Sequence, residues 1–456
     1  MISLLGKVKT IGCSKRLTYL RRSFGDIHLP DQENWTAADA EDFNLQDFQE
    51  YKESPDVILA KQNTLARPEK ETSVLENKQV AVKEIEEYAE AKQPLAMVSQ
   101  LTDPYLNLAI EDYLFDKMPL PEKKTSLNYN RLFLYANSPC VVIGKNQNPW
   151  KEVNLPLLNS LHIPLIRRRS GGGTVVHDLG NLNFAFMTTK SEFDRQKFSS
   201  IIRDAVNSSV PEDFKIDLNE RGDIVRRLDG IDYKVSGSAY KLSKGKFYHH
   251  GTMLLNLRLD ILSALLSRDE KKLGIVHSNA IYSVKSQVTN LGLDRQTIID
   301  IITSAFRGTF ANSFPSSHSA ATKTHPVPEM DKCDSAKALM IDESTSLPDS
   351  VYETSDNLKE WAWTYGSTPK FSHEIENEQM GFSITFHIDK EAKIKSYDLH
   401  FFTTDSGSQQ RIRDSLQFLD QLISKGDMYY TGSSVAGPIL DDLVSEWLGH
   451  SIDGSI

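Results

Sequence analysis

The first regular hydrophobic pattern along the chain begins at Leu95. A short apolar run at Leu95–Ser99 predicts a strand, and a helix start follows, because Asp103 can cap a helix whose first turn contains Pro104. Apolar residues then recur at helical spacing and should face a core: Leu106, Ala109, Ile110, Tyr113 and Leu114. Ordered structure is therefore expected from residue 95 onward.

Strand-like and helix-like patterns alternate further along the chain. Two β-type runs, at 131–135 and 140–144, are separated by Ala-Asn-Ser-Pro and predict a hairpin or adjacent strands. Other strand candidates lie at 183–187, 223–227, 233–236 and 252–257, and helical patterns lie at 195–206, 258–266 and 295–310. These patterns predict a mixed α/β core over residues 95–315.

The composition changes at residues 316–357, where Ser, Thr, Asp and Pro dominate without a sustained apolar period. This stretch predicts a disordered linker or insertion. Order resumes at Leu358, and alternating apolar residues from Phe382 to Ile388 predict a half-buried strand with an antiparallel partner at 396–402. With helices expected at 408–425 and 435–448, residues 358–456 form a small α+β domain.

The N-terminal part of the chain has a different character. Residues 1–25 carry six basic residues and no acidic one, which is typical of a mitochondrial transit peptide, with an ordinary basic tail as the alternative. A secretory signal is disfavoured because no uninterrupted apolar segment follows the charges. Residues 26–94 are acidic and polar, apart from one helix-like patch at 82–92, and predict a poorly ordered leader.

Composition limits the classes of function. The 456 residues carry a formal net charge of -10, which argues against a general nucleic-acid binder, and no apolar run is long enough to span a bilayer. The three cysteines, Cys13, Cys140 and Cys333, are too scattered for a disulfide framework or a thiolate metal site, so a reducing compartment is expected. Cys140 lies in an apolar run and should belong to the core.

Candidate chemistry gathers in the run Arg-Arg-Arg-Ser-Gly-Gly-Gly-Thr-Val-Val-His-Asp-Leu-Gly-Asn at 167–181. Three successive glycines let backbone amides approach an anion, and the arginines add positive charge, so the run predicts a phosphate site rather than a flexible linker. The Gly-x-x-x-x-Gly-Lys-[Ser/Thr] motif and a strand-linked Gly-x-Gly-x-x-Gly are both missing from the sequence, which disfavours P-loop and Rossmann folds.

A second run, Lys-Val-Ser-Gly-Ser-Ala-Tyr-Lys, begins at Lys234, where small residues leave room for a ligand. The Lys234 ammonium could bridge a carboxylate oxygen and an α-phosphate and stabilise the charge that develops when a carboxylate attacks ATP. The alternative is a solvated lysine on a strand.

Histidines could instead suggest a metal. His249 and His250 are adjacent, so on a strand they point to opposite faces and cannot both line one pocket, which disfavours a zinc triad. No metal-binding residue is therefore predicted. We expect His177 to order the loop after the glycines, and one of the adjacent pair to form a hydrogen bond within the fold.

The order of these motifs resembles the lipoate-protein ligase A family. The resemblance extends over most of residues 95–448 and rests on several segments in the family's order: Asp-Pro-Tyr-Leu-Asn-Leu-Ala-Ile-Glu at 103–111, Val-Ile-Gly-Lys-Asn-Gln-Asn-Pro-Trp-Lys-Glu at 142–152, the runs at 167–181 and 234–241, Phe-Tyr-His-His-Gly-Thr-Met-Leu-Leu-Asn at 247–256, and Ser-Val-Lys-Ser-Gln-Val-Thr-Asn-Leu at 283–291. Residues 361–373 resemble the start of that family's C-terminal accessory domain.

The resemblance implies a core similar to biotin protein ligases and class II aminoacyl-tRNA synthetases, which activate carboxylates as adenylates. It assigns the catalytic contact with nucleotide and lipoate to Lys234, and implies that residues 170–172 close over the adenylate. The other binding positions that it implies are Arg168, Gly171, Gly172, Gly173, Thr174, Val175, Val176, His177 and Asp223. The chain departs from the family pattern at Gly222, where the family often has Asn, at Arg169, in the leader and in the insertion at 316–356.

The sequence therefore predicts a ligase of the mitochondrial matrix that uses ATP and Mg²⁺ to convert lipoate to lipoyl-AMP. The expected acceptors are lysines of the lipoyl domains of 2-oxoacid dehydrogenase complexes and of the glycine cleavage H protein, with no nucleic-acid or membrane partner. One alternative is a lipoyltransferase that uses a ready-made lipoyl donor without ATP. Another is a non-catalytic protein that binds lipoyl domains, which Lys234 disfavours.

Overall fold

A seven-stranded sheet forms the centre of the fold. The computed structural model describes residues 80–121, 129–310, 338–437 and 442–455, which all belong to one compact unit. The sheet has the order β1 (Val80–Ala81), β14 (Leu339–Ile341), β2 (Leu95–Ser99), β3 (Arg131–Tyr135), β7 (Asn181–Thr189), β12 (Lys246–Leu254) and β11 (Ser238–Ser243). The first four strands run parallel and the remaining pairs are antiparallel, so the predicted mixed α/β core is confirmed.

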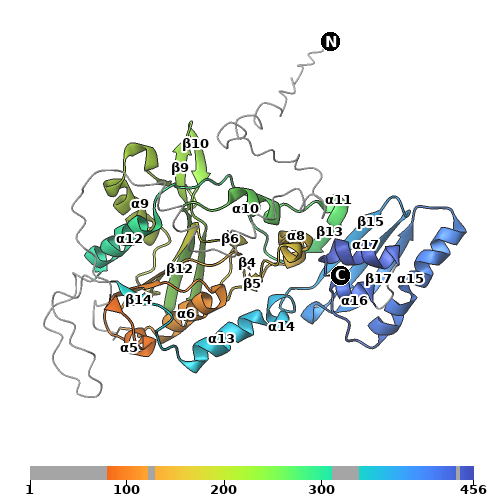
Figure 1. Ribbon diagram of the computed structural model, residues 1–456, viewed down its shortest axis with the longest axis horizontal. Helices are drawn as coiled ribbons and strands as arrows, with labels where there is room; N and C mark the ends of the chain where they lie inside the picture. The colour runs from red at the N-terminus through yellow and green to blue at the C-terminus, as the bar shows by residue number, and fades with distance from the viewer. Residues whose placement is uncertain (1–79, 122–128, 311–337, 438–441, 456) are drawn as a thin grey trace, which may run out of the picture. The chain divides into compact units, whose positions relative to one another are not determined.

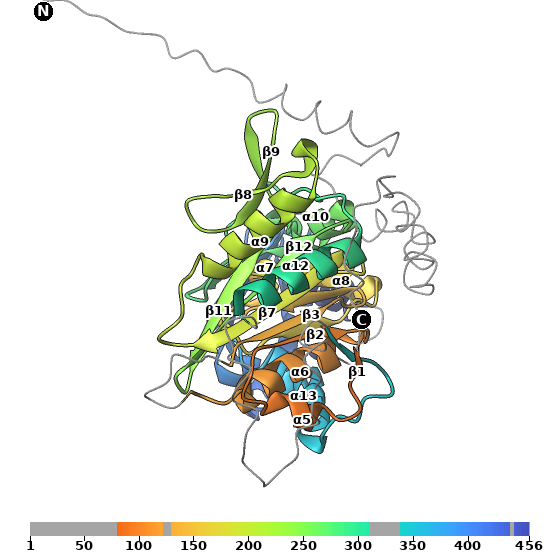
Figure 2. The same ribbon diagram turned by 90° about the vertical axis from the view of Figure 1, so that its left-hand side faces the viewer.

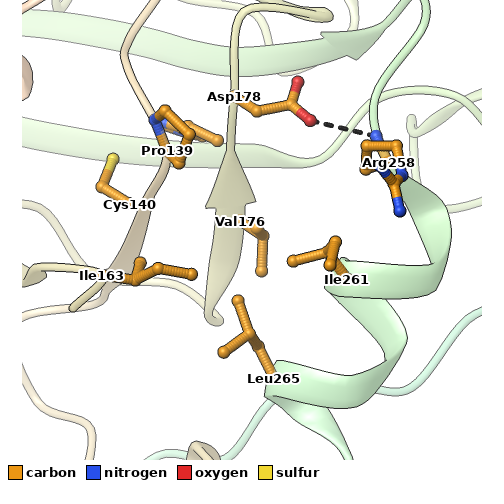
Figure 3. Close-up of a pocket in the computed structure, with 9 residues that line it drawn as sticks. Pro139, Cys140, Ile163, Val176, Asp178, Arg258, Ile261 and Leu265 are labelled. Carbon is orange, nitrogen blue, oxygen red and sulfur yellow. Dashed lines mark hydrogen bonds between the residues drawn. The ribbon is translucent and has the colours of Figure 1, made fainter. Parts of the chain in front are cut away.

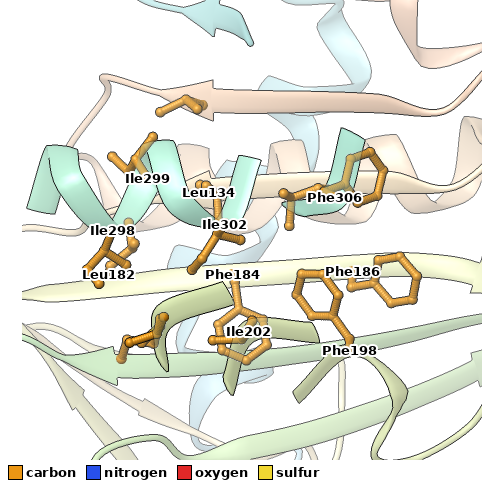
Figure 4. Close-up of a cluster of buried hydrophobic side chains, with 14 of the residues drawn as sticks. Leu134, Leu182, Phe184, Phe186, Phe198, Ile202, Ile298, Ile299, Ile302 and Phe306 are labelled. Carbon is orange, nitrogen blue, oxygen red and sulfur yellow. The ribbon is translucent and has the colours of Figure 1, made fainter. Parts of the chain in front are cut away.

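Helices cover both faces of this sheet (Figures 1 and 2). On one face lie α9 (Lys197–Ser209) and α12 (Arg295–Phe310), whose apolar side chains pack against Phe184, Phe186 and Leu134 of the strands (Figure 4). On the other face lie α5 (Ile85–Ala89), α6 (Pro104–Lys117) and α13 (Asp349–Lys359). As predicted, the Asp103 side chain caps α6 by accepting the backbone N–H groups of Tyr105 at 2.8 Å and Leu106 at 3.1 Å.

A second, three-stranded sheet carries the glycine run. Its order is β5 (Leu165–Arg167), β4 (Cys140–Ile143) and β6 (Val175–His177), with α7 (Pro149–Glu152) and α8 (Leu155–Ser160) between β4 and β5. The predicted pairing of the runs at 131–135 and 140–144 is therefore wrong. The intervening chain crosses from the large sheet to the small one, and the buried Asn137 is held there by the side-chain amide of Asn107 at 3.0 Å.

The sequence motifs after β7 form smaller elements. A three-stranded sheet has the order β10 (Ile231–Lys234), β9 (Ile224–Leu228) and β8 (Asp217–Leu218), and η2 (Glu212–Phe214) precedes it. Two short helices, α10 (Leu259–Leu266) and α11 (Glu270–Leu273), follow β12. Directly after this hairpin, the carbonyl oxygen of Val235 accepts the N–H of Leu254 on β12 at 2.8 Å, so Lys234 lies next to the main sheet.

The C-terminal part is a four-stranded antiparallel sheet with helices. The strand order is β13 (Ile275–Ser278), β15 (Phe371–Asn377), β16 (Phe382–Ile388) and β17 (Ile394–Phe401). Along the chain, α14 (Trp361–Thr364) precedes β15, and η4 (Lys390–Ala392) lies between β16 and β17. The helices α15 (Ser406–Ser424), α16 (Gly432–Ala436) and α17 (Leu443–Ile452) follow β17. The apolar residues Phe382, Ile384, Phe386 and Ile388 of β16 are buried as predicted, but Ser383 between them is buried as well. The prediction of a single helix at 435–448 is wrong, because α16 ends at Ala436 and the next residue, Gly437, has a φ of 63° that breaks the helical path.

Two expectations of disorder are corrected within the described residues. Residues 338–357 contain β14, whose three residues are all buried, and most of α13, so this part of the predicted linker is folded. Residues 80–94 contain β1 and α5, and bury Val82, Ile85 and Ala89 in the core. The predicted transit peptide, the leader up to residue 79 and residues 311–337 lie outside the described residues. In the part of the chain that is described, no helix has the length and apolar character needed to cross a membrane.

Candidate active site

The glycine run forms a tight loop between β5 and β6. Gly172 has a φ of 95°, and a Cβ at this position would lie 2.9 Å from Cβ of Ala239 on β11. A Cβ on Gly144 would lie only 2.1 Å from the carbonyl oxygen of Gly172. Glycine is therefore needed at both 144 and 172. The backbone of Gly172 lies too close to Gly144 and to β11 for a side chain at either position.

Arg168 holds this loop from within. Its guanidinium Nη2 donates to the carbonyl oxygens of Gly171 and Gly173, both at 2.7 Å, and its Nε donates to Oγ of Ser170 at 3.0 Å. Burial lowers the pKa of Arg168 to about 10, so the side chain remains a cation at neutral pH. The buried guanidinium of Arg168 thus bonds the loop itself and the carbonyl oxygen of Val142 at 3.2 Å, so its role in the structure is to hold the loop, and the predicted ATP contact at Arg168 stays a prediction.

Lys234 and Asp223 form an ion pair. Nζ of Lys234 lies 3.1 Å from Oδ1 of Asp223, and the two side chains are 22% and 12% exposed. Asp223 immediately precedes β9, and antiparallel pairing with β10 sets Lys234 opposite Val225. The structure therefore brings together two residues that the sequence indicated separately.

Gly222, where the chain departs from the family pattern, precedes this carboxylate. It has a φ of 80°, a conformation that glycine adopts readily. The Asn219 side chain accepts the backbone N–H of Asp223 at 3.0 Å and so fixes the turn. Glycine at this position is thus compatible with the placement of Asp223.

Residues 283–289 connect the lysine to the glycine loop. The backbone N–H of Lys234 donates to the carbonyl oxygen of Gln287 at 2.9 Å, and the N–H of Thr289 donates to the carbonyl oxygen of Lys234 at 3.1 Å. At the other end of this segment, Oγ of Ser283 accepts the backbone N–H of Thr174 at 2.8 Å. The two predicted halves of the site therefore share one hydrogen-bonded segment.

A chain of buried polar groups lies behind the glycine loop. Oγ of Ser170 is 2.8 Å from Nε2 of His250, whose Nδ1 is 2.9 Å from Oε1 of Glu111, and the Tyr135 hydroxyl donates to Oε2 of Glu111 at 2.9 Å. Burial alone would raise the pKa of Glu111, but His250 and Tyr135 outweigh it and the pKa is lowered. The carboxylate is thus charged, and the chain fixes the orientation of His250 and Ser170.

The histidines lie as the sequence suggested. His249 faces away from His250, with its Nε2 3.0 Å from Oγ of Ser238, so the two rings occupy opposite faces of β12. His177 is buried after the glycine loop, and its Nδ1 lies 3.1 Å from the side-chain nitrogen of Asn137. Burial, with contributions from Arg168 and His250, lowers the pKa of His177 to about 3, so this ring is neutral.

Other motif residues are structural. Asp178 accepts the N–H groups of Gly180 at 2.6 Å and Arg258 at 3.0 Å, next to a small apolar cavity lined by Cys140, Val176 and Ile261 (Figure 3). Cys140 is fully buried, which raises the pKa of its thiol and confirms it as a core residue. Among the described residues, no group of three or more His, Cys, Asp and Glu side chains could hold a metal ion.

Comparisons with known proteins agree on one family. Residues 103–310 match the family model described as the lipoyl protein ligase A/B catalytic domain. A protein of Saccharomyces cerevisiae (strain S288c) named "Putative lipoate-protein ligase A" is 37% identical over 307 residues, which cover 67% of this chain and 68% of the relative.

Two solved structures are similar over large parts of the chain. The structure of Plasmodium falciparum LipL1 in complex with lipoate is 25% identical, with a TM-score of 0.46 over 75% of this chain and 93% of that one. The bipartite lipoate protein ligase of Thermoplasma acidophilum, described with its E2 lipoyl domain, is 19% identical, with a TM-score of 0.43 over 61% of this chain and 98% of that one.

Proposed function

We propose that this chain, which belongs to the lipoate-protein ligase A family of enzymes, activates lipoate with ATP and transfers the lipoyl group to a lysine of a lipoyl domain. Lipoate ligation follows from the family. The observation that supports the ATP-dependent route is the half-buried Lys234–Asp223 pair, tied through residues 283–289 to the glycine loop. The pair and the glycine loop are thereby connected through one hydrogen-bonded segment, and we take both to contact the same ligand.

In the first half-reaction, a carboxylate oxygen of lipoate attacks the α-phosphorus of ATP. The new phosphorus–oxygen bond forms lipoyl-AMP, and the bond to the β-phosphate breaks to release pyrophosphate. Lys234 stabilises the negative charge on the carboxylate and α-phosphate oxygens, and Asp223 holds the ammonium group in place. Phosphate oxygens are bound by backbone N–H groups of the glycine loop other than that of Thr174, which donates to Oγ of Ser283.

In the second half-reaction, the amine of the acceptor lysine attacks the carbonyl carbon of lipoyl-AMP. A carbon–nitrogen bond forms, the carbon–oxygen bond to AMP breaks, and AMP leaves with that electron pair while the amine loses a proton to solvent. The acceptors are lipoyl domains of 2-oxoacid dehydrogenase complexes and the glycine cleavage H protein, which we place with this enzyme in the mitochondrial matrix. The basic, acid-free residues 1–25 support that location.

Mg²⁺ accompanies the nucleotide in this proposal. Because no group of three metal-ligating side chains occurs in the described part of the chain, the fit is to an ion held mainly by phosphate oxygens and water. When bound, it would neutralise phosphate charge. The residues of the chain itself supply the orientation and the cation at the carboxylate.

A lipoyltransferase without ATP activation is the alternative, and the departure from the family pattern at Gly222, next to the predicted nucleotide contact Asp223, would favour it. Since Asn219 holds Asp223 beside Lys234 despite Gly222, this feature no longer distinguishes the two functions.

An acceptor assay tests the proposal. The purified protein is mixed with an apo lipoyl domain and lipoate, and the intact mass of the domain is measured with and without ATP and Mg²⁺. A mass increase of one lipoyl group only when ATP is present supports the ligase. Modification only when lipoyl-AMP is supplied would instead identify the transferase.

A further inference from the structure

The segment between Ile281 and Gln287 is bonded to the glycine loop through one residue, Ser283. Every residue in it except Ser283 is exposed, including the apolar side chains of Tyr282 and Val284, which are 67% and 57% exposed. Apolar packing therefore does not fix its position. Its place beside the glycine loop depends on the hydrogen bonds of Ser283 and one backbone bond from Ile281 to Asn146.

Ser283 is bonded on both its backbone and its side chain. Its N–H donates to the Glu152 carboxylate, at 3.1 Å from Oε2 and 3.3 Å from Oε1. Its Oγ accepts from the backbone N–H of Thr174 at 2.8 Å and from Nε2 of Gln147 at 3.0 Å. Gln147 is oriented in turn by the N–H of Gly144, which donates to its Oε1 at 2.8 Å.

Glu152, which makes several of these contacts, lies on the short helix α7, and this helix is anchored by a buried side chain. It is the last residue of α7, and Trp150 on the same turn is 1% exposed and stacks on Phe371 with ring centroids 5.1 Å apart. Oγ1 of Thr174 lies 3.4 Å from Oε2 of Glu152, so the carboxylate contacts both the glycine loop and Ser283. The Glu152 carboxylate accepts hydrogen bonds from an amide and a hydroxyl group. Within the described residues it forms no ion pair with Lys, Arg or His.

The same segment leads to Lys234. Gln287, which accepts the backbone N–H of Lys234 at 2.9 Å, lies four residues after Ser283 in the chain. One continuous segment therefore bonds both the glycine loop, through Ser283, and the end of β10, through Gln287. Thr174, bonded to the same serine, belongs to the loop that presents the backbone amides.

We propose that Glu152 is a positioning residue for the adenylate: its carboxylate holds Ser283 against Thr174, so that the glycine-loop amides and Lys234 face one ligand. This inference rests on the proposed function, because it takes the ligand to be lipoyl-AMP. Glu152 acts through Ser283 and Thr174 and contacts neither the reacting carbonyl nor the phosphorus.

Binding of a stable analogue tests this role without requiring turnover. The dissociation constant of a lipoyl-sulfamoyl adenosine is measured by calorimetry for the wild type, Glu152→Ala, Glu152→Gln and the control Glu353→Gln, which changes an exposed carboxylate on α13. Loss of two hydrogen bonds to a charged acceptor should weaken binding about tenfold or more in Glu152→Ala. Glu152→Gln should stay within about threefold of the wild type, because its amide oxygen still accepts the Ser283 N–H.

The melting temperature separates positioning from folding. We expect Glu152→Ala to melt within a few degrees of Glu353→Gln. Unchanged affinity in Glu152→Ala, equal losses in the Ala and Gln variants, a large fall in melting temperature, or a wild type that does not bind the analogue would each overturn the role of Glu152. Failure of ATP activation is recognised separately, as a wild type that binds the analogue and yet releases no pyrophosphate from ATP and lipoate.

Discussion

Lys234 stands out in the sequence because small residues follow it, and in the structure its ammonium group is held by an ion pair with Asp223. A partly exposed ion pair contributes little to folding stability, typically below about 1 kcal/mol. The two charged groups are 3.1 Å apart, with Lys234 as the last residue of β10 and Asp223 just before β9. The value of the pair therefore lies in orienting the ammonium group.

Replacing Lys234 tests that role directly. Lys234→Ala should lower the rate of lipoyl-AMP formation by about 10²-fold or more, because one preorganised cation at the developing charge is removed. The melting temperature should stay near that of Lys271→Ala, which removes an exposed lysine in α11. Near wild-type turnover in Lys234→Ala would contradict the assignment.

Buried histidines predict an acid dependence of stability. Burial lowers the pKa of His249 to about 3, and those of His177 and His373 are also lowered to about 3. Since an unfolded histidine titrates near pH 6.5, the unfolded chain binds protons that the native chain does not. This contribution to stability is complete above about pH 6.5 and is lost as pH falls below it, by about 1.4 kcal/mol per pH unit for each histidine.

The effect can be assigned to one residue. His249→Gln should reduce the slope of unfolding free energy against pH between about pH 6 and 4 by about one proton. Ser424→Ala, which changes an exposed and non-titrating side chain on α15, serves as the control and should leave the slope unchanged. Chemical denaturation at several pH values measures both, and equal slopes for the wild type and His249→Gln would refute the assignment.

Not every residue of the site could be predicted. Lys234 and Asp223 lie close in the sequence and were both singled out. In contrast, Glu111, His250 and Ser170 meet across separations of 139 and 80 residues, and Glu152 meets Ser283 across 131 residues. No local pattern marks such contacts, because they depend on how α6, β12 and the small sheet pack.

At the scale of elements, prediction succeeded where a pattern was long. The helix expected at 295–310 is α12, and the alternating strand in the C-terminal part is β16. It failed for β14, because its apolar run of four residues at 338–341 is short and lies inside a polar stretch, and only pairing with β1 and β2 makes it a strand. The connection between β3 and β4 was misjudged for the same reason, since tertiary packing sends the strands to different sheets.

The close contact of two loops gives a test at this scale. Gly144→Ala should displace the glycine loop, because the new Cβ would lie 2.1 Å from the carbonyl oxygen of Gly172, and lipoyl-AMP formation should fall at least about tenfold as the loop loses its geometry. Gly308→Ala on α12 places its Cβ in open space and should raise stability by about 0.5–1 kcal/mol without a loss of activity. Initial rates of pyrophosphate release compare the two, and a fully active Gly144→Ala would rule out the steric role.

At the scale of the whole described unit, the C-terminal part is joined to the rest by buried contacts. Arg167 on β5 donates to the carbonyl oxygen of Thr364 at 2.9 Å and to Oγ1 of Thr368 at 2.8 Å. Trp150 packs against Phe371 and Tyr430, with ring centroids 5.1 and 5.4 Å apart. The sequence indicated a separate accessory domain, whereas β13, from before the polar stretch, pairs with β15 after it.

Truncation should therefore unfold the protein instead of releasing a catalytic domain. A chain ending at Phe314 loses β14, which lies between β1 and β2, and α13, which covers α6, so its core is left open. Circular dichroism should show no cooperative thermal transition for this chain, unlike the full-length protein. A cooperative transition with intact transfer from lipoyl-AMP would contradict this expectation.

The most direct test of the central claim is ATP–pyrophosphate exchange with the purified full-length protein and no acceptor present. We predict that labelled pyrophosphate enters ATP only when lipoate and Mg²⁺ are supplied, because the site forms lipoyl-AMP reversibly before any lysine arrives. Absence of lipoate-dependent exchange, while lipoyl groups still pass from supplied lipoyl-AMP to a lipoyl domain, would contradict the claim and leave a transferase.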